Sequence, residues 1–276
     1  MNFLVQWGKN PWGEDILTHA QFGLLYLALA FGVCFMIGHT LFVKFWPKPA
    51  GPPIPPPSPV SEAQAAKIPA RVKRHSLAAR AFHWIMAASM LTLLVTAFVP
   101  ILGLKFNWIQ IHWIAGIVLT ISIIYHIIHA SFWLDFWSIW LNKQDVNEVV
   151  VRFKRVMGGN APAPRKAAKY PWDNKMYHTA IVLSALAVIP TGLLMMKRIQ
   201  TPFYVRNPYL FSDSTWGLMY VLHGLSGIGL VGLTMAHIYF AIRPEKLWIT
   251  KGMVFGDITR EEFLKHHDPQ RWMVEK

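Results

Sequence analysis

Five long stretches without a charged side chain constrain this chain more than any other feature. They run from Ile16 to Val43, Ala81 to Leu104, Phe106 to Leu134, Met176 to Met196 and Ser214 to Ile242. A helix needs roughly 20 mostly apolar residues to cross the hydrocarbon core of a bilayer, and each stretch is long enough. We therefore predict an all-α integral membrane protein with about five transmembrane helices, which leaves little material for a soluble domain.

The basic side chains gather in alternate connections between these stretches. The first connection, the connection after the third stretch and the C-terminal tail are rich in Lys and Arg, whereas the other connections hold few. This is the positive-inside distribution of a membrane protein. The net charge of +13 therefore does not indicate nucleic-acid binding. The distribution of basic residues among the connections places the N-terminus outside and the C-terminus in the cytoplasm.

Composition divides the chain into four predicted parts. Residues 1–46 hold an N-terminal tail and an additional transmembrane helix, and residues 47–67 form a Pro-rich linker that begins PKPAGPPIPPPSP. Residues 68–245 are predicted to form a four-helix up-and-down bundle, with a short surface helix around Val146 to Met157 in its basic connection. Residues 246–276 are predicted to be a cytoplasmic tail.

Histidine is the residue type best placed to hold a cofactor, because Cys34 is the only cysteine. A single cysteine excludes an internal disulfide, a thiolate-bound iron–sulfur cluster and the C-x-x-C-H attachment of a c-type haem. Several of the twelve histidines lie in the apolar stretches. A polar ring inside a bilayer is costly unless it has a partner or binds a metal.

Two stretches carry histidines at the same spacing. His223 and His237 are fourteen residues apart in the last stretch, and His112 and His126 repeat this spacing in the third. In a helix, this spacing puts two rings on nearly the same face and roughly 20 Å apart along the axis. Neutral imidazole is a usual axial ligand of b-type haem iron. The spacing therefore predicts two haem b groups stacked across the membrane.

Depth in the membrane pairs the histidines of different stretches. With the N-terminus outside, His112 and His223 share the outer half of the membrane, and we call them the outer pair. His83 opens the second stretch at its cytoplasmic end and can meet His237 in the inner half; we call these two the inner pair. His126 also lies in the inner half, so depth alone leaves it as an alternative inner ligand.

Small residues follow two of these histidines. Gly116 comes one turn after His112, while Gly224 and Gly227 follow His223. Glycines next to a ligand leave room for a flat macrocycle against the backbone, although small residues also line ordinary contacts between transmembrane helices. Beside histidines at matching depths, the pattern favours haem.

Seven short motifs follow one another along the chain. They are Arg80-Ala81-Phe82-His83-Trp84, His112-Trp113-Ile114-Ala115-Gly116, Lys169-Tyr170, His223-Gly224-Leu225-Ser226-Gly227, His237-Ile238-Tyr239, Gly252-Met253 and His266-His267-Asp268-Pro269-Gln270-Arg271-Trp272. In their order and spacing, the chain from about Ile68 onward resembles the cytochrome b (gamma) subunit of membrane-bound formate dehydrogenases. It resembles the cytochrome b of nickel–iron hydrogenases more loosely.

This resemblance implies that the outer pair holds one haem and the inner pair the other. It favours His83 over His126, which is left a supporting role near the inner haem or the quinone. It also implies that an iron–sulfur subunit and a catalytic subunit lie on the outer face, and that menaquinone or ubiquinone exchanges electrons near the inner haem. The chain itself would carry no catalytic residue. In that setting it lies in a bacterial or archaeal cytoplasmic membrane.

The quinone pocket of the family uses a loop that begins Lys-Tyr and continues with Asn and Gly. This sequence reads KYPWDNK from Lys169 to Lys175, so Pro171 stands where Asn is expected. The resemblance still predicts a quinone pocket at this position. The expected lining residues are Tyr170, Asp173, Asn174 and His178.

Four arginines are expected near the level of the inner haem, namely Arg71, Arg74, Arg80 and Arg243. They either bind haem propionates through charge-assisted hydrogen bonds or serve only to set the topology. We single out Arg80 as the propionate ligand. His19 and His39 are expected near the two ends of the first helix, facing the interface or a partner rather than haem.

Two alternatives remain from the sequence. The same anchor would suit a hydrogenase or another molybdenum enzyme. A protein of another class, a haem-free membrane anchor or a transporter, would use the histidines for protons, substrate or helix contacts. The apolar stretches contain no carboxylate or lysine, which weakens a proton-coupled transporter.

Overall fold

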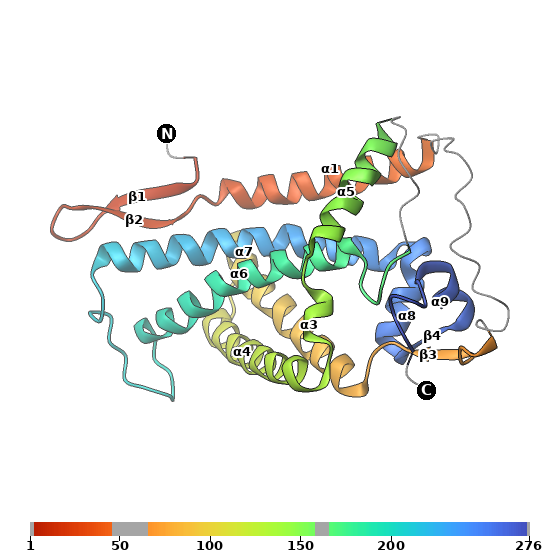
Figure 1. Cartoon of the computed structure of the whole chain (residues 1–276). Coiled ribbons are helices and arrows are strands. Elements are labelled where there is room, and N and C mark those ends of the chain that lie inside the picture. The colour runs from red at the N-terminus through yellow and green to blue at the C-terminus, as the bar shows by residue number, and fades with distance from the viewer. Residues whose placement is uncertain (1–2, 46–65, 158–165, 275–276) are drawn as a thin grey trace. The chain divides into compact units, whose positions relative to one another are not determined.

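The computed structural model describes residues 3–45, 66–157 and 166–274, and in these residues five helices are long and apolar enough to cross a membrane (Figure 1). They are α1 (Gly23–Phe45), α3 (Leu77–Phe98) extended by the 3₁₀ turn η1 (Val99–Leu102), α4 (Trp108–Trp133), α6 (Trp172–Met195) extended by η3 (Met196–Arg198), and α7 (Asp213–Ile242). The predicted all-α membrane fold with five spanning helices is confirmed. Helices form here because lipid offers no hydrogen-bond partners to backbone N–H and C=O groups. Each apolar segment must therefore form its backbone hydrogen bonds within itself.

A β-hairpin precedes the first of these helices. Strand β1 (Val5–Lys9) pairs antiparallel with β2 (Asp15–Ala20). Asn10 shapes the turn between them, because its side-chain oxygen accepts from the backbone N–H groups of Trp12 and Glu14. The uncharged stretch from Ile16 to Val43 is therefore not helical throughout, because its first residues, up to Ala20, pair in β2.

The described residues fall into two compact units. The first comprises the residues up to Gly38, then Phe82–Ile128 and Ala180–Ile238. In this unit α1 runs alongside α7, and Ala20, Leu25, Ile228 and Val231 form a shared apolar core (Figure 1). The N-terminal helix is thus packed against the last helix of the predicted bundle.

Two glycines of the first unit allow close approach to α7. A Cβ at Gly32 of α1 would lie 2.7 Å from Cε of Met235. A Cβ at Gly217 of α7 would collide with the backbone carbonyl of Leu17 in β2. A backbone carbonyl cannot swing away as the end of a side chain can, so Gly217 fixes how closely the hairpin lies on α7.

The second unit comprises, among the described residues, His39–Ala81, His129–Thr179 and the part from Tyr239 onward. The predicted surface helix is confirmed as α5 (Lys143–Val156), and its first turn is closed by a capping box between Asn142 and Asp145. Asp145 also forms an ion pair of 2.9 Å with Lys175, and the two residues are only 3% and 5% exposed. The Pro-rich run at 47–59 and the turn-rich GGNAPAP stretch lie outside the described residues.

The region after α7 is folded as well. Helix α8 (Leu247–Phe255), strand β4 (Asp257–Thr259) and helix α9 (Arg260–His266) follow one another, and β4 pairs antiparallel with β3 (Arg71–Lys73) (Figure 1). Val72, Ile258 and Phe263 form a small core there. Sequence analysis predicted a tail at 246–276 and did not anticipate this sheet.

A buried arginine links the parts of the second unit. Arg74 is 2% exposed and its guanidinium lies over the rings of Trp248 and Trp272. Its Nη2 donates to the backbone oxygen of Lys169, and its Nη1 lies 2.9 Å from Nε2 of His267. Burial lowers the pKa of Arg74 to about 10.

The ring of His267 is held in one neutral form. Its Nδ1 lies 2.7 Å from the carbonyl oxygen of Ala168, which can only accept, so Nδ1 carries the proton. Nε2 is then free to accept from Arg74. Burial, together with the nearby charge of Arg74, lowers the pKa of His267 to about 4.

Candidate functional site

The structure brings together the same histidines that depth in the membrane pairs. In the outer pair, the ring centroids of His112 on α4 and His223 on α7 are 6.2 Å apart, with an angle of 65° between the rings. In the inner pair, the centroids of His83 on α3 and His237 on α7 are 6.3 Å apart at 48°. All four residues belong to the first unit. Their role as metal ligands stays a prediction.

His126 lies against a neighbouring aromatic ring of α3. Its ring stacks on Phe82, with centroids 4.2 Å apart and ring planes 5° from parallel. The inner pair thus takes its second ring from α3, while His126 packs beside the residue that precedes His83. The supporting role that the resemblance implies for His126 stays a prediction.

The outer pair is held by threonines that the sequence analysis did not single out. Thr96 Oγ1 of α3 lies 2.8 Å from Nδ1 of His112, and Thr191 Oγ1 of α6 lies 3.1 Å from Nδ1 of His223. In contrast, Nδ1 of His83 is buried and has no hydrogen-bond partner among the described residues. A signal in the sequence existed, because hydroxyl residues inside apolar helices commonly bond to polar groups of neighbouring helices.

The glycines beside the outer pair differ in the space around them. A Cβ on Gly116 or Gly227 would meet only one side-chain atom within 4 Å, at 3.8 Å, so space is open one turn beyond each histidine. A Cβ on Gly224 would lie 3.1 Å from Cβ of Ala20, which makes that glycine a packing contact. Gly192 on α6 was not predicted, yet a Cβ there would lie 3.0 Å from Cε1 of His223.

Residues 74–256 match the sequence profile of the family described as Prokaryotic cytochrome b561. The chain belongs to the prokaryotic cytochrome b561 family. The match covers α3, α4, α6 and α7, and therefore both histidine pairs. Members of this family bind haem b, so the chain is a multi-pass membrane cytochrome b. No curated protein matches the chain significantly.

Both histidine pairs of this cytochrome b561 family member have the separation that a haem iron needs. A metal–imidazole nitrogen distance is roughly 2 Å and a ring centroid lies roughly 1 Å behind its nitrogen, so two axial rings have centroids about 6 Å apart. The observed 6.2 and 6.3 Å agree with this value. Together with the open space beside Gly116 and Gly227, the residues present fit haem b.

The predicted quinone residues cluster around the start of α6 in the second unit. Asp173 forms an ion pair with Lys246, and the ammonium group of Lys169 lies over the ring of Tyr170. Burial raises the pKa of Tyr170, so its phenol keeps its proton. Asn174 lies in the first turn, where its backbone N–H donates to the oxygen of Pro171. Their contact with quinone stays a prediction.

His178, the fourth of these residues, lies against the ring of Trp140. The rings of Trp140 and His178 meet edge to face with centroids 5.4 Å apart. Trp140 Nε1 and His178 Nδ1 are both buried and have no hydrogen-bond partner among the described residues. These two buried ring nitrogens can form hydrogen bonds with the polar head group of a quinone.

The arginines considered for haem propionates have different partners. Arg80 Nη1 donates to the backbone oxygen of Val254 at 2.6 Å, and its Nε has no partner among the described residues. Arg71 pairs with Asp257, and Arg243 pairs with Glu245. Arg80 thus keeps free donor capacity three residues before His83, and its propionate role remains a prediction.

The two histidines of the N-terminal segment both contact aromatic side chains. His19 lies on β2 and stacks on Phe22, with centroids 4.7 Å apart, so it is not a helix-end residue as expected. In the second unit, Nδ1 of His39 lies 2.9 Å from the hydroxyl oxygen of Tyr239. His39 thus contacts the chain's own α7, and its orientation toward the interface or a partner protein stays a prediction.

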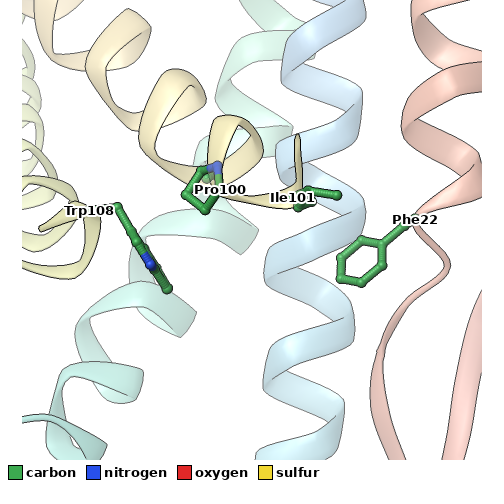
Figure 2. Close-up of a pocket in the computed structure, with 5 residues that line it drawn as sticks. Phe22, Pro100, Ile101 and Trp108 are labelled. Carbon is green, nitrogen blue, oxygen red and sulfur yellow. The ribbon is translucent and has the colours of Figure 1, made fainter. Parts of the chain in front are cut away.

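An open, apolar pocket of about 600 Å³ lies in the first unit. Figure 2 shows residues that line it. Phe22, Ala97, Pro100, Ile101 and Trp108 line it. It lies where α3 ends and α4 begins, next along the chain to Thr96. Its lining includes no charged group and none of the predicted quinone residues.

Proposed function

We propose that the chain is a di-haem electron-transfer subunit that connects a partner oxidoreductase with the membrane quinone pool. The observation that carries this proposal is the presence of two histidine pairs with centroid separations of 6.2 and 6.3 Å. His112 and His223 would hold the outer haem b, and His83 and His237 the inner haem b. When bound, haem b supplies one-electron chemistry between ferric and ferrous iron.

The protein's own contribution is to fix these ligands at two depths. Because His223 and His237 are fourteen residues apart on the continuous helix α7, they lie roughly 20 Å apart along its axis. This spacing spans much of an apolar core roughly 30 Å thick. One pair therefore serves each half of the membrane, and the surrounding apolar helices keep water from both.

We further propose that quinone exchanges electrons near the start of α6. Tyr170, Asp173, Asn174 and His178 are the candidate contacts, and the two unpartnered ring nitrogens of Trp140 and His178 support the location. Menaquinone or ubiquinone would suit such a site. Arg80 would bind a propionate of the inner haem.

The partner follows from the family resemblance alone. We propose an iron–sulfur subunit and a catalytic subunit on the outer face, as in a formate dehydrogenase, with a hydrogenase or another molybdenum enzyme as the alternative. The N-terminus would then lie outside and the C-terminus in the cytoplasm. Substrate oxidation would occur entirely on the partner subunits.

Haem counting tests the ligand assignment. The purified chain, reduced with dithionite, should show a b-type α band and two haems per chain. His223→Ala should remove the outer haem and His237→Ala the inner one, whereas His126→Ala should leave both. A chain without haem, or two haems remaining in His223→Ala, would contradict the assignment. Loss of the inner haem in His126→Ala would make His126, in place of His83, the inner ligand.

Quinone and partner need separate measurements. Addition of a quinol analogue should reduce haem in the wild-type protein and more slowly in His178→Phe, which fills the same space without ring nitrogens. An unchanged rate would place the quinone elsewhere. Co-purifying subunits identified by mass spectrometry would decide between a formate dehydrogenase and a hydrogenase.

A further inference from the structure

Both histidines of the outer pair meet a buried threonine hydroxyl that comes from another helix. Thr96 is 2% exposed and its Oγ1 lies 2.8 Å from Nδ1 of His112. Thr191 is 8% exposed and its Oγ1 lies 3.1 Å from Nδ1 of His223. Two independent helices, α3 and α6, thus supply the same contact to the two rings.

The proton in each contact can be located from the other neighbour of the hydroxyl. Thr96 Oγ1 is 2.7 Å from the backbone oxygen of Thr92, and Thr191 Oγ1 is 2.6 Å from that of Ala187. A carbonyl oxygen only accepts and a hydroxyl has one proton, so each hydroxyl donates to its own helix. If it donated to histidine instead, two oxygens would face each other at that distance without a proton between them. Each threonine therefore accepts from the Nδ1–H of its histidine.

We propose that Thr96 and Thr191 are positioning residues that lock both rings of the outer pair in the Nδ1–H form. Nε2 of each ring then keeps its lone pair for iron. This inference rests on the proposed function, because it assigns the metal-binding nitrogen of ligands that the proposal names. A hydrogen bond at the second nitrogen of a ligand histidine fixes its tautomer and orientation and makes it a stronger electron donor.

In the inner pair, His83 lacks such a hydrogen bond, because Nδ1 of its ring has no partner among the described residues. The two iron sites thus differ in their hydrogen bonding, which is one of the means by which a protein sets haem potential. A more basic imidazole stabilises ferric over ferrous iron. The two hydroxyls therefore lower the potential of the outer haem and leave that of the inner haem unaffected.

The test is a redox titration of both haems in the full chain carrying Thr191→Val or Thr96→Val. Valine keeps the branched shape and removes the hydroxyl, while Thr191→Ser and Thr96→Ser keep the hydroxyl. Thr92→Val is the matched control, since the Thr92 hydroxyl bonds to the Ala88 oxygen of its own helix. We expect the outer haem of each valine variant to titrate at a higher potential, with a several-fold lower ratio of oxidised to reduced iron at a fixed applied potential. Serine variants, the control and the inner haem should titrate as in the wild type.

Low-temperature electron paramagnetic resonance of the ferric protein gives a second readout. The signal of the outer haem should change in the valine variants, because the ring is free to turn, and should persist in the serine variants. Loss of the outer haem in valine but not serine variants also supports the lock. Unchanged potentials, equal shifts of both haems, or haem loss in both valine and serine variants would overturn it. A wild-type chain with fewer than two haems would overturn the proposed function as well, which distinguishes the two failures.

Discussion

Acid should destabilise the second unit mainly through the ring of His267. The ring is 1% exposed, donates through Nδ1 to Ala168 and accepts from Arg74 through Nε2. A second proton would have to sit on Nε2, which faces the Arg74 guanidinium. The folded protein therefore resists protonation, and the pKa of His267 falls from 6.5 to about 4.

The sign and size of the effect follow from these two pKa values. Above pH 6.5, His267 is neutral in both the folded and the unfolded chain, so stability is complete. As pH falls from about 6.5 to about 4, the unfolded chain binds a proton that the folded chain refuses, and stability is lost. The lowered pKa corresponds to a loss of about 3 kcal/mol in the free energy of unfolding, reached near the lower end of that range.

Thermal unfolding of the purified protein in detergent, between pH 8 and pH 4, measures this loss. His267→Asn should be less stable than the wild type at pH 8 but should lose less stability on acidification. His266→Asn is the control, because His266 stacks on Trp248 and is less buried than its neighbour, although burial lowers its pKa too. It should flatten the pH dependence less. Parallel pH profiles of the wild type and His267→Asn would refute the reasoning.

Three further predictions concern close packing and a buried ion pair. Gly192→Leu should lower haem content, because even a Cβ there would lie 3.0 Å from Cε1 of His223; an absorbance ratio of haem to protein equal to that of the wild type would contradict it. Lys175→Met should lower the free energy of unfolding by about 3–5 kcal/mol, since it leaves the buried Asp145 carboxylate unpaired, and adding Asp145→Leu should recover much of the loss. Gly217→Ala should lift the N-terminal hairpin from α7, which limited proteolysis would detect as faster cleavage near Gly13; unchanged cleavage would speak against the contact.

Hydropathy and histidine spacing were sufficient to predict the number of spanning helices and the two histidine pairings. The number of spanning helices follows from the energetic cost of charge in lipid, which acts on each segment independently of its neighbours. The His112–His223 and His83–His237 pairings follow from depth, because loop charges set the direction of each helix and the residue count sets the level. Both inferences need only local information along the chain.

The features that the sequence did not predict depend on contacts between segments that are distant along the chain. Whether Ile16 to Ala20 forms helix or strand depends on a partner strand, Val5–Lys9, and on the turn built by Asn10. The roles of Thr96, Thr191 and Gly192 depend on which helix lies beside which histidine, and spacing within one helix does not contain that information. The folded region after Lys246 is held by β3, a segment nearly 190 residues earlier in the chain.

Helix α7 contributes a ring to each histidine pair, whereas α3 and α4 contribute to one pair each. If α7 slid by one residue, it would move by about 1.5 Å and turn by about 100°, and it would carry His223 and His237 out of alignment together. A displaced α3 or α4 would move a ring of only one pair. Faults in α7 should therefore disturb both histidine pairs at once, and the packing of α1 along α7 restrains the helix that the two pairs share.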